Sequence, residues 1–168
     1  MADSFKNGAG PALACVAFAD REDMHARRIP ARRPSGAGVT PLPPEVRELF
    51  AGANTAHVAT LMRDGAPHCV PMWIGVEGDR LAFLSSPASV KGRNVRRDPR
   101  VSISVTDAAR PNSMAQVRGR VGEILEGDPA WELIDRIAHK YIGAPYPLRT
   151  DRVLFLVDAE RAWAQAFG

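Results

Sequence analysis

From residue 43 onward, short segments of alternating apolar and polar residues are separated by turn residues. The alternation is clearest where Val101, Ile103 and Val105 are interleaved with hydroxyl side chains, a pattern typical of a half-buried strand. Asp64-Gly65 lies between two such segments and favours a hairpin turn, because glycine tolerates a positive φ. Six segments predict strands: residues 55–62, 67–76, 80–85, 101–106, 114–125 and 152–157.

Three further segments predict helices. A short one follows Pro43-Pro44, a second covers the basic segment up to Asp98-Pro99, and the longest spans residues 129–142 before Gly143. Because the strands follow one another with few long crossovers, they favour antiparallel hairpins over βαβ units. The chain therefore predicts a mainly β fold, a small six-stranded antiparallel barrel with a few helices, and Gly119 and Gly122 are expected to bend its longest strand.

The first forty residues differ from the rest of the chain. They contain clusters of Gly, Pro and Ala and the basic run HARRIPARR, without a sustained apolar period. We therefore expect residues 1–40 to be a disordered extension and residues 41–168 to form the folded domain.

Composition narrows the class of protein. With 168 residues, 45% hydrophobic and 24% charged, the chain suits one globular domain, and no apolar run is long enough to span a membrane. Its two cysteines, Cys15 and Cys69, form no CxxC pair, and its four histidines lack ligand spacing, so neither a disulfide framework nor a metal site is expected. We expect a cytoplasmic protein.

The positive charge is concentrated in one place. The segment KGRNVRRDPR at residues 91–100 has five cations against one carboxylate, although the net charge of the chain is only +3. It follows the hydroxyls of Ser85 and Ser86, and a helix beginning there would add backbone N–H donors, a set suited to phosphate. A solvated helix face is the alternative. Nucleic acid is disfavoured because aromatic residues, 7% of the chain, are not interleaved with the cations.

No nucleophile elbow, P-loop, GxGxxG or paired-carboxylate motif is present. An anion-binding segment without a catalytic constellation suits an enzyme whose cofactor supplies the chemistry. The sequence assigns no proton donor: His68, Tyr141 and Tyr146 are candidates, and core packing is the more common role for such residues.

The order of these motifs resembles a known family. Lys91 with Arg93-Asn94 and RRDPR, the VATL strand, Met72-Trp73 and the segment HKYIGAPYP are similar to the flavin and deazaflavin oxidoreductases of the pyridoxamine 5'-phosphate oxidase-like split β-barrel superfamily. Within it, the sequence most resembles the coenzyme F420-dependent branch. The resemblance covers residues 43–163. The chain lacks the Arg-x-Val-Leu-Leu-Lys motif of the pyridoxamine phosphate oxidases themselves.

The resemblance implies a homodimeric split β-barrel with cofactor grooves at the interface of the two subunits. It implies transfer of a hydride from reduced F420 to an electron-poor double bond of a small organic substrate. An FMN-dependent oxidoreductase and a non-catalytic flavin-binding protein remain the alternatives. The implied phosphate ligands are Lys91, Arg93, Asn94, Arg97, Ser85 and Ser86. The residues implied to line the cofactor ring are Val70, Pro71, Met72 and Trp73.

Overall fold

The computed structural model describes residues 29–30 and 40–166. Most of the predicted N-terminal extension therefore lies outside the described residues. The exception is strand β1 (Ile29–Pro30), whose two residues pair with Ile124 and Glu123. Within the described part of the chain, no helix is long and apolar enough to cross a membrane.

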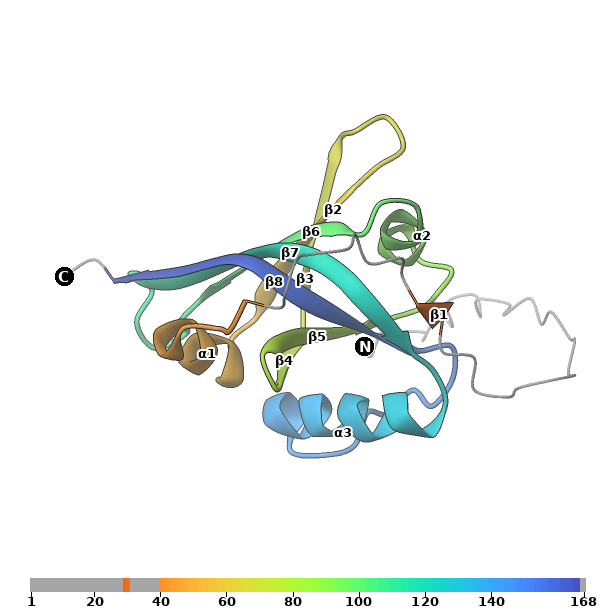
Figure 1. Cartoon of the computed structure of the whole chain (residues 1–168). Coiled ribbons are helices and arrows are strands. Elements are labelled where there is room, and N and C mark those ends of the chain that lie inside the picture. Colours follow the sequence, from red (N-terminus) through yellow and green to blue (C-terminus); the bar gives the residue numbers. More distant parts are fainter. Residues whose placement is uncertain (1–28, 31–39, 167–168) are drawn as a thin grey trace, which may run out of the picture.

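One antiparallel sheet forms most of the molecule (Figure 1). Its strands are ordered β3-β2-β6-β7-β8-β5-β4, and β1 pairs with β7 outside this path. Their bounds are β2 Ala56–Leu61, β3 Pro67–Met72, β4 Ile74–Glu77, β5 Arg80–Ser85, β6 Arg100–Thr106, β7 Ser113–Leu125 and β8 Val153–Ala166. The helices are α1 (Pro44–Ala51), α2 (Val90–Arg97) and α3 (Asp128–Ile142). The predicted mainly β, split-barrel fold is confirmed, but the described residues form eight strands instead of the predicted six, because residues 67–76 divide into two strands and β1 is added.

The predicted strand at residues 67–76 is in fact two strands, because the chain turns at Trp73. Met72 is the last residue of β3 to pair with β2, and Ile74 is the first residue of β4 to pair with β5. The Tyr141 hydroxyl accepts a hydrogen bond from the Ile74 N–H at 3.1 Å, so the backbone at the turn bonds with α3 instead of a strand. Since β3 and β4 end the strand order, this corner joins the two edges of the sheet.

The last predicted strand is longer than expected. It was expected at residues 152–157, whereas β8 continues to Ala166 alongside β7. Two irregularities in this pairing fall beside Gly119 and Gly122, which confirms both predicted bends. Gly119 is required there, because a Cβ at this position would lie 2.1 Å from the Asp158 carbonyl oxygen.

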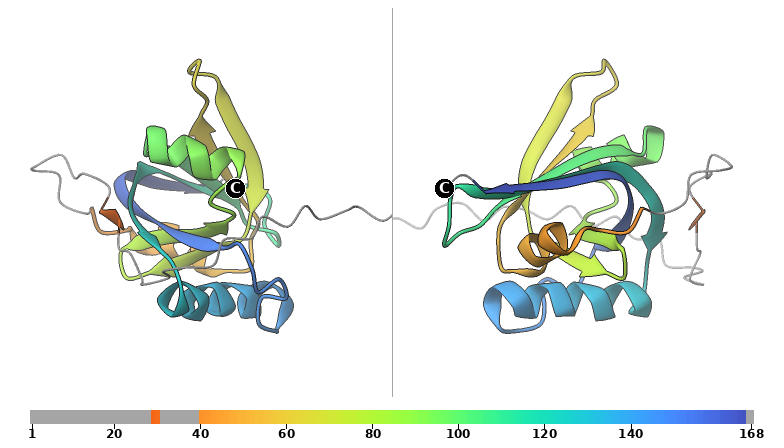
Figure 2. Two further views of the ribbon diagram at one scale, coloured as in Figure 1. Left: turned by 90° about the vertical axis from the view of Figure 1, so that its right-hand side faces the viewer. Right: turned by 60° about the vertical axis from the view of Figure 1, so that its left-hand side comes forward.

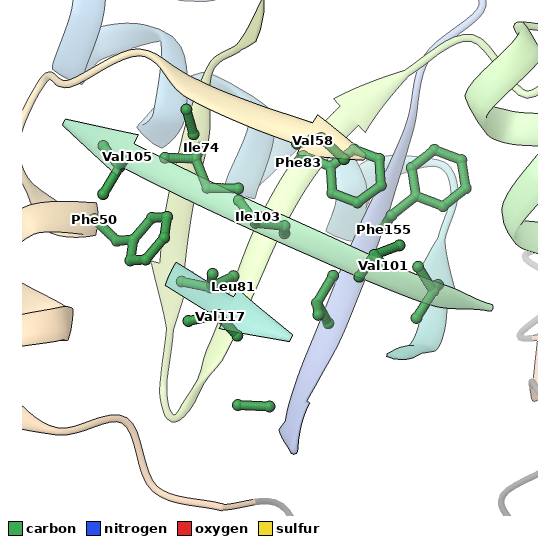
Figure 3. Packing of buried hydrophobic residues seen from close by; sticks show 14 of the residues in the cluster. Phe50, Val58, Ile74, Leu81, Phe83, Val101, Ile103, Val105, Val117 and Phe155 are labelled. Carbon is green, nitrogen blue, oxygen red and sulfur yellow. The ribbon is translucent and has the colours of Figure 1, made fainter. Parts of the chain in front are cut away.

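Two apolar clusters stabilise the fold. The larger fills the barrel, where Phe83 and Phe155 stack with ring centroids 4.9 Å apart (Figure 3). The smaller lies between α3 and the opposite faces of β5 and β8, around Ile134 and Leu154. Residues 81–84 of β5 and 153–157 of β8 are therefore buried on both faces, which explains why these stretches are continuously apolar.

The hairpin of β2 and β3 projects beyond the rest of the sheet (Figures 1 and 2). Along β3, exposed side chains alternate with partly buried ones, and the exposed set includes Cys69 and Pro71. Helix α2 lies beside the base of this hairpin and leads from β5 into β6.

Candidate functional site

An apolar cavity of about 330 Å³ opens at the corner of the barrel. Its lining contains the residues Thr55, Pro71, Met72, Trp73, Leu84 and Tyr146. Three of the four predicted ring-contact residues are thus brought together. Val70, the fourth, lies farther along β3 and is partly buried, outside this lining.

Aromatic packing fixes the wall of the cavity. Trp73 stacks on Tyr141 with ring centroids 5.2 Å apart and planes 5° from parallel, and it meets Tyr146 edge to face at 6.0 Å. The Tyr141 hydroxyl also donates to the carbonyl oxygen of Asn54 at 2.7 Å. The wall of the cavity is therefore held by α3 and the segment that follows it.

Serine hydroxyls build the N-terminus of α2. The Ser89 Oγ accepts from the Gly92 N–H at 3.0 Å, which is an N-cap bond, and lies 3.0 Å from the Ser85 Oγ. The Ser86 Oγ accepts from the Ala88 N–H at 3.1 Å. Both serines predicted to bind phosphate therefore shape the turn that leads to Lys91.

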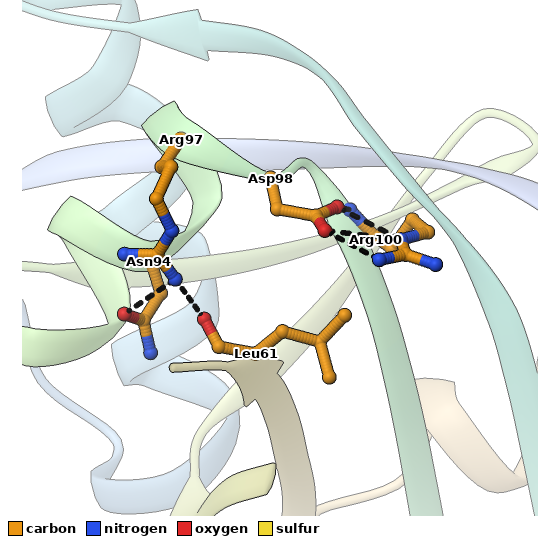
Figure 4. A network of polar contacts seen from close by, with 5 residues as sticks. All are labelled: Leu61, Asn94, Arg97, Asp98 and Arg100. Atoms are coloured by element: carbon orange, nitrogen blue, oxygen red, sulfur yellow. Dashed lines mark hydrogen bonds and ion pairs between the residues drawn. The ribbon is translucent and has the colours of Figure 1, made fainter. Parts of the chain in front are cut away.

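Three of the predicted phosphate ligands bond with the protein itself. The Asn94 Nδ2 donates to the Thr60 Oγ1 at 3.0 Å. The Arg97 Nη2 donates to the Leu61 carbonyl oxygen and, at 3.3 Å, to the Asn94 Oδ1 (Figure 4). Arg93 donates to the Ala88 carbonyl oxygen. The contacts of Asn94 and Arg97 attach α2 to β2, whereas that of Arg93 stays within the turn before α2. Binding of phosphate by Arg93, Asn94 and Arg97 stays a prediction.

Asp98 ends α2 and is fixed by Arg100. The guanidinium of Arg100 donates to both carboxylate oxygens of Asp98 at 2.6–3.1 Å (Figure 4). These bonds lower the pKa of Asp98 to about 2. Two of the charges in the basic segment therefore compensate each other.

Lys91 is different from its neighbours. Within the described residues it makes no hydrogen bond or salt bridge, although it is partly buried at the first turn of α2. Burial lowers the pKa of Lys91, and the positive charge of Arg152 lowers it further. No sequence pattern predicted that Arg152 lies near Lys91, because the two residues are 61 positions apart in the chain. The pairing of β5 with β8, which sets Ser85 opposite Val153, places Arg152 beside the end of β5 from which the chain continues to Lys91.

The three candidate proton donors have different surroundings. Tyr141 uses its hydroxyl for backbone contacts at the barrel corner. His68 has a buried Nδ1 without a hydrogen-bond partner among the described residues. Tyr146 lines the cavity, and its hydroxyl oxygen accepts from the Arg152 Nε at 3.2 Å. Of these three residues, Tyr146 is therefore the one that lines the cavity. No group of three potential metal ligands occurs among the described residues.

Solved structures similar to this chain share its barrel. One titled F420 Reductase is 28% identical with a TM-score of 0.64, over 73% of this chain and 98% of the other. The conserved hypothetical protein Rv2991 from Mycobacterium tuberculosis is 25% identical with a TM-score of 0.64, over 80% and 90%. The General Stress Protein 26 from Bacillus anthracis is 17% identical with a TM-score of 0.56, over 71% of this chain and 90% of the other, and shows the fold alone.

A comparison with curated proteins finds no match. The sequence profile described as Pyridoxamine 5'-phosphate oxidase matches residues 42–166, which covers the entire barrel and the three helices. This chain therefore belongs to the pyridoxamine 5'-phosphate oxidase family, whose members are generally flavin-binding oxidoreductases on a split barrel.

Proposed function

We propose that this protein is an F420-dependent reductase that transfers a hydride from the reduced deazaflavin to an electron-poor double bond of a small organic substrate. The observation that carries the proposal is an aromatic-walled cavity that is linked through Tyr146 and Arg152 to Lys91, a lysine without a hydrogen bond or salt bridge among the described residues. An apolar wall fits a planar ring, and a partly buried ammonium fits a phosphate. The similar structure titled F420 Reductase supports the deazaflavin over FMN.

The cofactor supplies the hydride chemistry when it is bound, and the chain supplies binding and orientation. Trp73 and Leu84 offer apolar surface to a ring and exclude water from it. Lys91 binds the phosphate, and the Tyr146 hydroxyl is available to a substrate at the cavity. Because hydride transfer depends on close, aligned approach, this positioning is the main catalytic contribution of the protein.

We also propose that the protein acts as a homodimer. Antiparallel register places His57, Pro71, Ser104, Gln116 and Trp163 in one row across five strands. Four of these side chains are exposed, including Trp163 at 43%, and Gln116 is the partly buried one. A row that combines an exposed indole with a proline and uncharged polar groups suits a second copy of the same face.

Binding and turnover test the cofactor proposal together. Purified protein is titrated with F420 and separately with FMN, and fluorescence gives both Kd values. We expect F420 to bind at micromolar Kd or tighter and FMN to bind more weakly, and reduced F420 to be oxidised when enone substrates are added. Preferential binding of FMN would move the protein to the FMN-dependent class. F420 binding without turnover of any acceptor would indicate a binding protein.

The Lys91→Ala variant tests the site. Loss of a hydrogen bond between ammonium and phosphate costs about 1.5–3 kcal/mol, so we expect the Kd for F420 to rise ~10- to 150-fold. Arg47→Ala is the matched control. It removes one positive charge from an ion pair with Asp79, which lies at the opposite end of β5 from Ser85. Equal Kd values for the Lys91 variant and the wild type would contradict phosphate binding and support the alternative, in which the basic segment is a solvated helix face.

A further inference from the structure

Arg152 is held at the edge of the candidate site. It precedes β8, and the pairing of Ser85 with Val153 sets it beside the end of β5, from which the chain turns into α2 and Lys91. Asp151, just before it, has a φ of 52°, and no other described residue except glycine has a positive φ. This turn fixes where the Arg152 side chain leaves the backbone.

The guanidinium of Arg152 is oriented by contacts that leave part of it available. Its Nε donates to the Tyr146 hydroxyl at 3.2 Å, and its Cζ lies 5.7 Å from the centroid of that ring. The Nη1 donates to the Asp151 carbonyl oxygen at 2.7 Å. Within the described residues the Nη2 makes no hydrogen bond, so its two N–H groups remain for a ligand.

The charge of Arg152 is only weakly compensated. Its side chain is 19% exposed, and its ion pair with Asp151 spans 4.0 Å to a carboxylate that is 59% exposed. Lys91, the neighbouring cation, has no ion pair among the described residues. Two partly buried cations that repel each other are costly to hold together, and an anion between them removes that cost.

We propose that Arg152 and Lys91 together form the binding site for the phosphate of the cofactor, so that Arg152 determines the preference for phosphorylated over phosphate-free ligands. Tyr146 connects this anion site with the ring cavity, because it lines the cavity and accepts the hydrogen bond from Arg152. The inference rests on the proposed function only in assuming a flavin or deazaflavin ligand that carries a phosphate.

The test compares two ligand pairs that differ in the phosphate: F420 with its phosphate-free deazaflavin chromophore, and FMN with riboflavin. For the Arg152→Gln variant we expect Kd for the phosphorylated member to rise roughly 10- to 100-fold, while Kd for the phosphate-free member changes less than about threefold. Arg152→Lys retains the charge without the planar fork and should recover part of the loss. Arg47→Gln, which removes a distant charge, should leave both Kd values unchanged.

The outcomes separate this inference from the cofactor proposal. If the wild type prefers FMN to F420, the cofactor proposal fails and the FMN and riboflavin pair still decides the role of Arg152. An Arg152→Gln protein that keeps the wild-type ratio of the two Kd values overturns the inference. So does an equal loss of affinity for both members, because that would indicate a role in holding the cavity. A wild type that binds no member, or does not discriminate between members, also overturns it.

Discussion

Asn94 attaches α2 to the base of the projecting hairpin, and replacing it by alanine separates a structural role from phosphate binding. The residue is 3% exposed, and its amide joins the Thr60 hydroxyl to the Arg97 guanidinium. Thr60 is itself 2% exposed. If these contacts are the main role of Asn94, the variant should lose stability while its affinity for F420 stays close to that of the wild type.

The size of the loss follows from the bonds removed. Three side-chain hydrogen bonds disappear, including a weak one from the Asn94 Nδ2 to the Met62 Sδ at 3.5 Å. The Thr60 hydroxyl keeps only a 3.5 Å contact with the His68 carbonyl oxygen, so it is left nearly unsatisfied. These effects cost about 2–4 kcal/mol. Alanine is the better helix former by about 0.5 kcal/mol. We expect a net destabilisation of about 1.5–3.5 kcal/mol, which lowers Tm by roughly 5–15 °C in a domain of this size.

Thermal and urea unfolding followed by circular dichroism measure the effect, and F420 titration well below the transition measures affinity. Thr60→Val and the double variant complete a cycle, in which the two losses should be less than additive by about 0.5–3 kcal/mol. The reasoning is refuted if Asn94→Ala unfolds at the wild-type temperature and its Kd for F420 rises tenfold or more. That pair of results would identify Asn94 as a phosphate ligand.

Two further predictions concern other parts of the molecule. Burial lowers the pKa of Lys140 to about 8, against an ordinary value of 10.5, so between these pH values the unfolded chain holds a proton that the folded protein has released. The contribution of Lys140 to the free energy of unfolding should therefore rise with pH across this window. Urea titrations at several pH values should show a shallower rise for Lys140→Met than for the wild type. Parallel curves of unfolding free energy against pH for the two proteins would contradict this prediction. Light scattering should give the wild type twice the 18.2 kDa of one chain and Trp163→Glu a single-chain mass, and an unchanged mass for the variant would exclude this face as the dimer interface.

The sequence predicted the strands whose pattern is local. Alternation identified β6, and glycine at the bulges identified the bends of β7, because both signals depend on neighbouring residues. The turn at Trp73 could not be predicted, since it depends on a hydroxyl from Tyr141, far along the chain. The second half of β8 was missed for a similar reason: its alanines and polar residues carry little strand preference, and pairing with β7 determines their conformation.

In the candidate site, too, features that depend on neighbouring residues were predictable and features that depend on long-range contacts were not. A dense run of cations in the sequence indicated the segment that forms α2, and Pro71, Met72 and Trp73, which the resemblance implied as ring contacts, lie together at a cavity. Sequence alone could not show which cations already have partners, because the carbonyl groups that Arg93 and Arg97 contact carry no pattern of their own. The sequence predicted no binding role for Arg152, because it lies outside the basic segment in a chain that is rich in arginine.

The corner at Trp73 also has a consequence for the order in which the protein assembles. Strands β3 and β4 are adjacent in sequence but lie at opposite ends of the strand order, and β8 fills the place between β7 and β5. The two halves of the sheet thus remain unjoined until residues 153–158, which pair with β5, have been synthesised. Because long-range pairing of this kind forms slowly, a nascent chain carries an open sheet edge until these residues are available to pair. The cavity, which needs both Trp73 and Leu84, is among the last features to form.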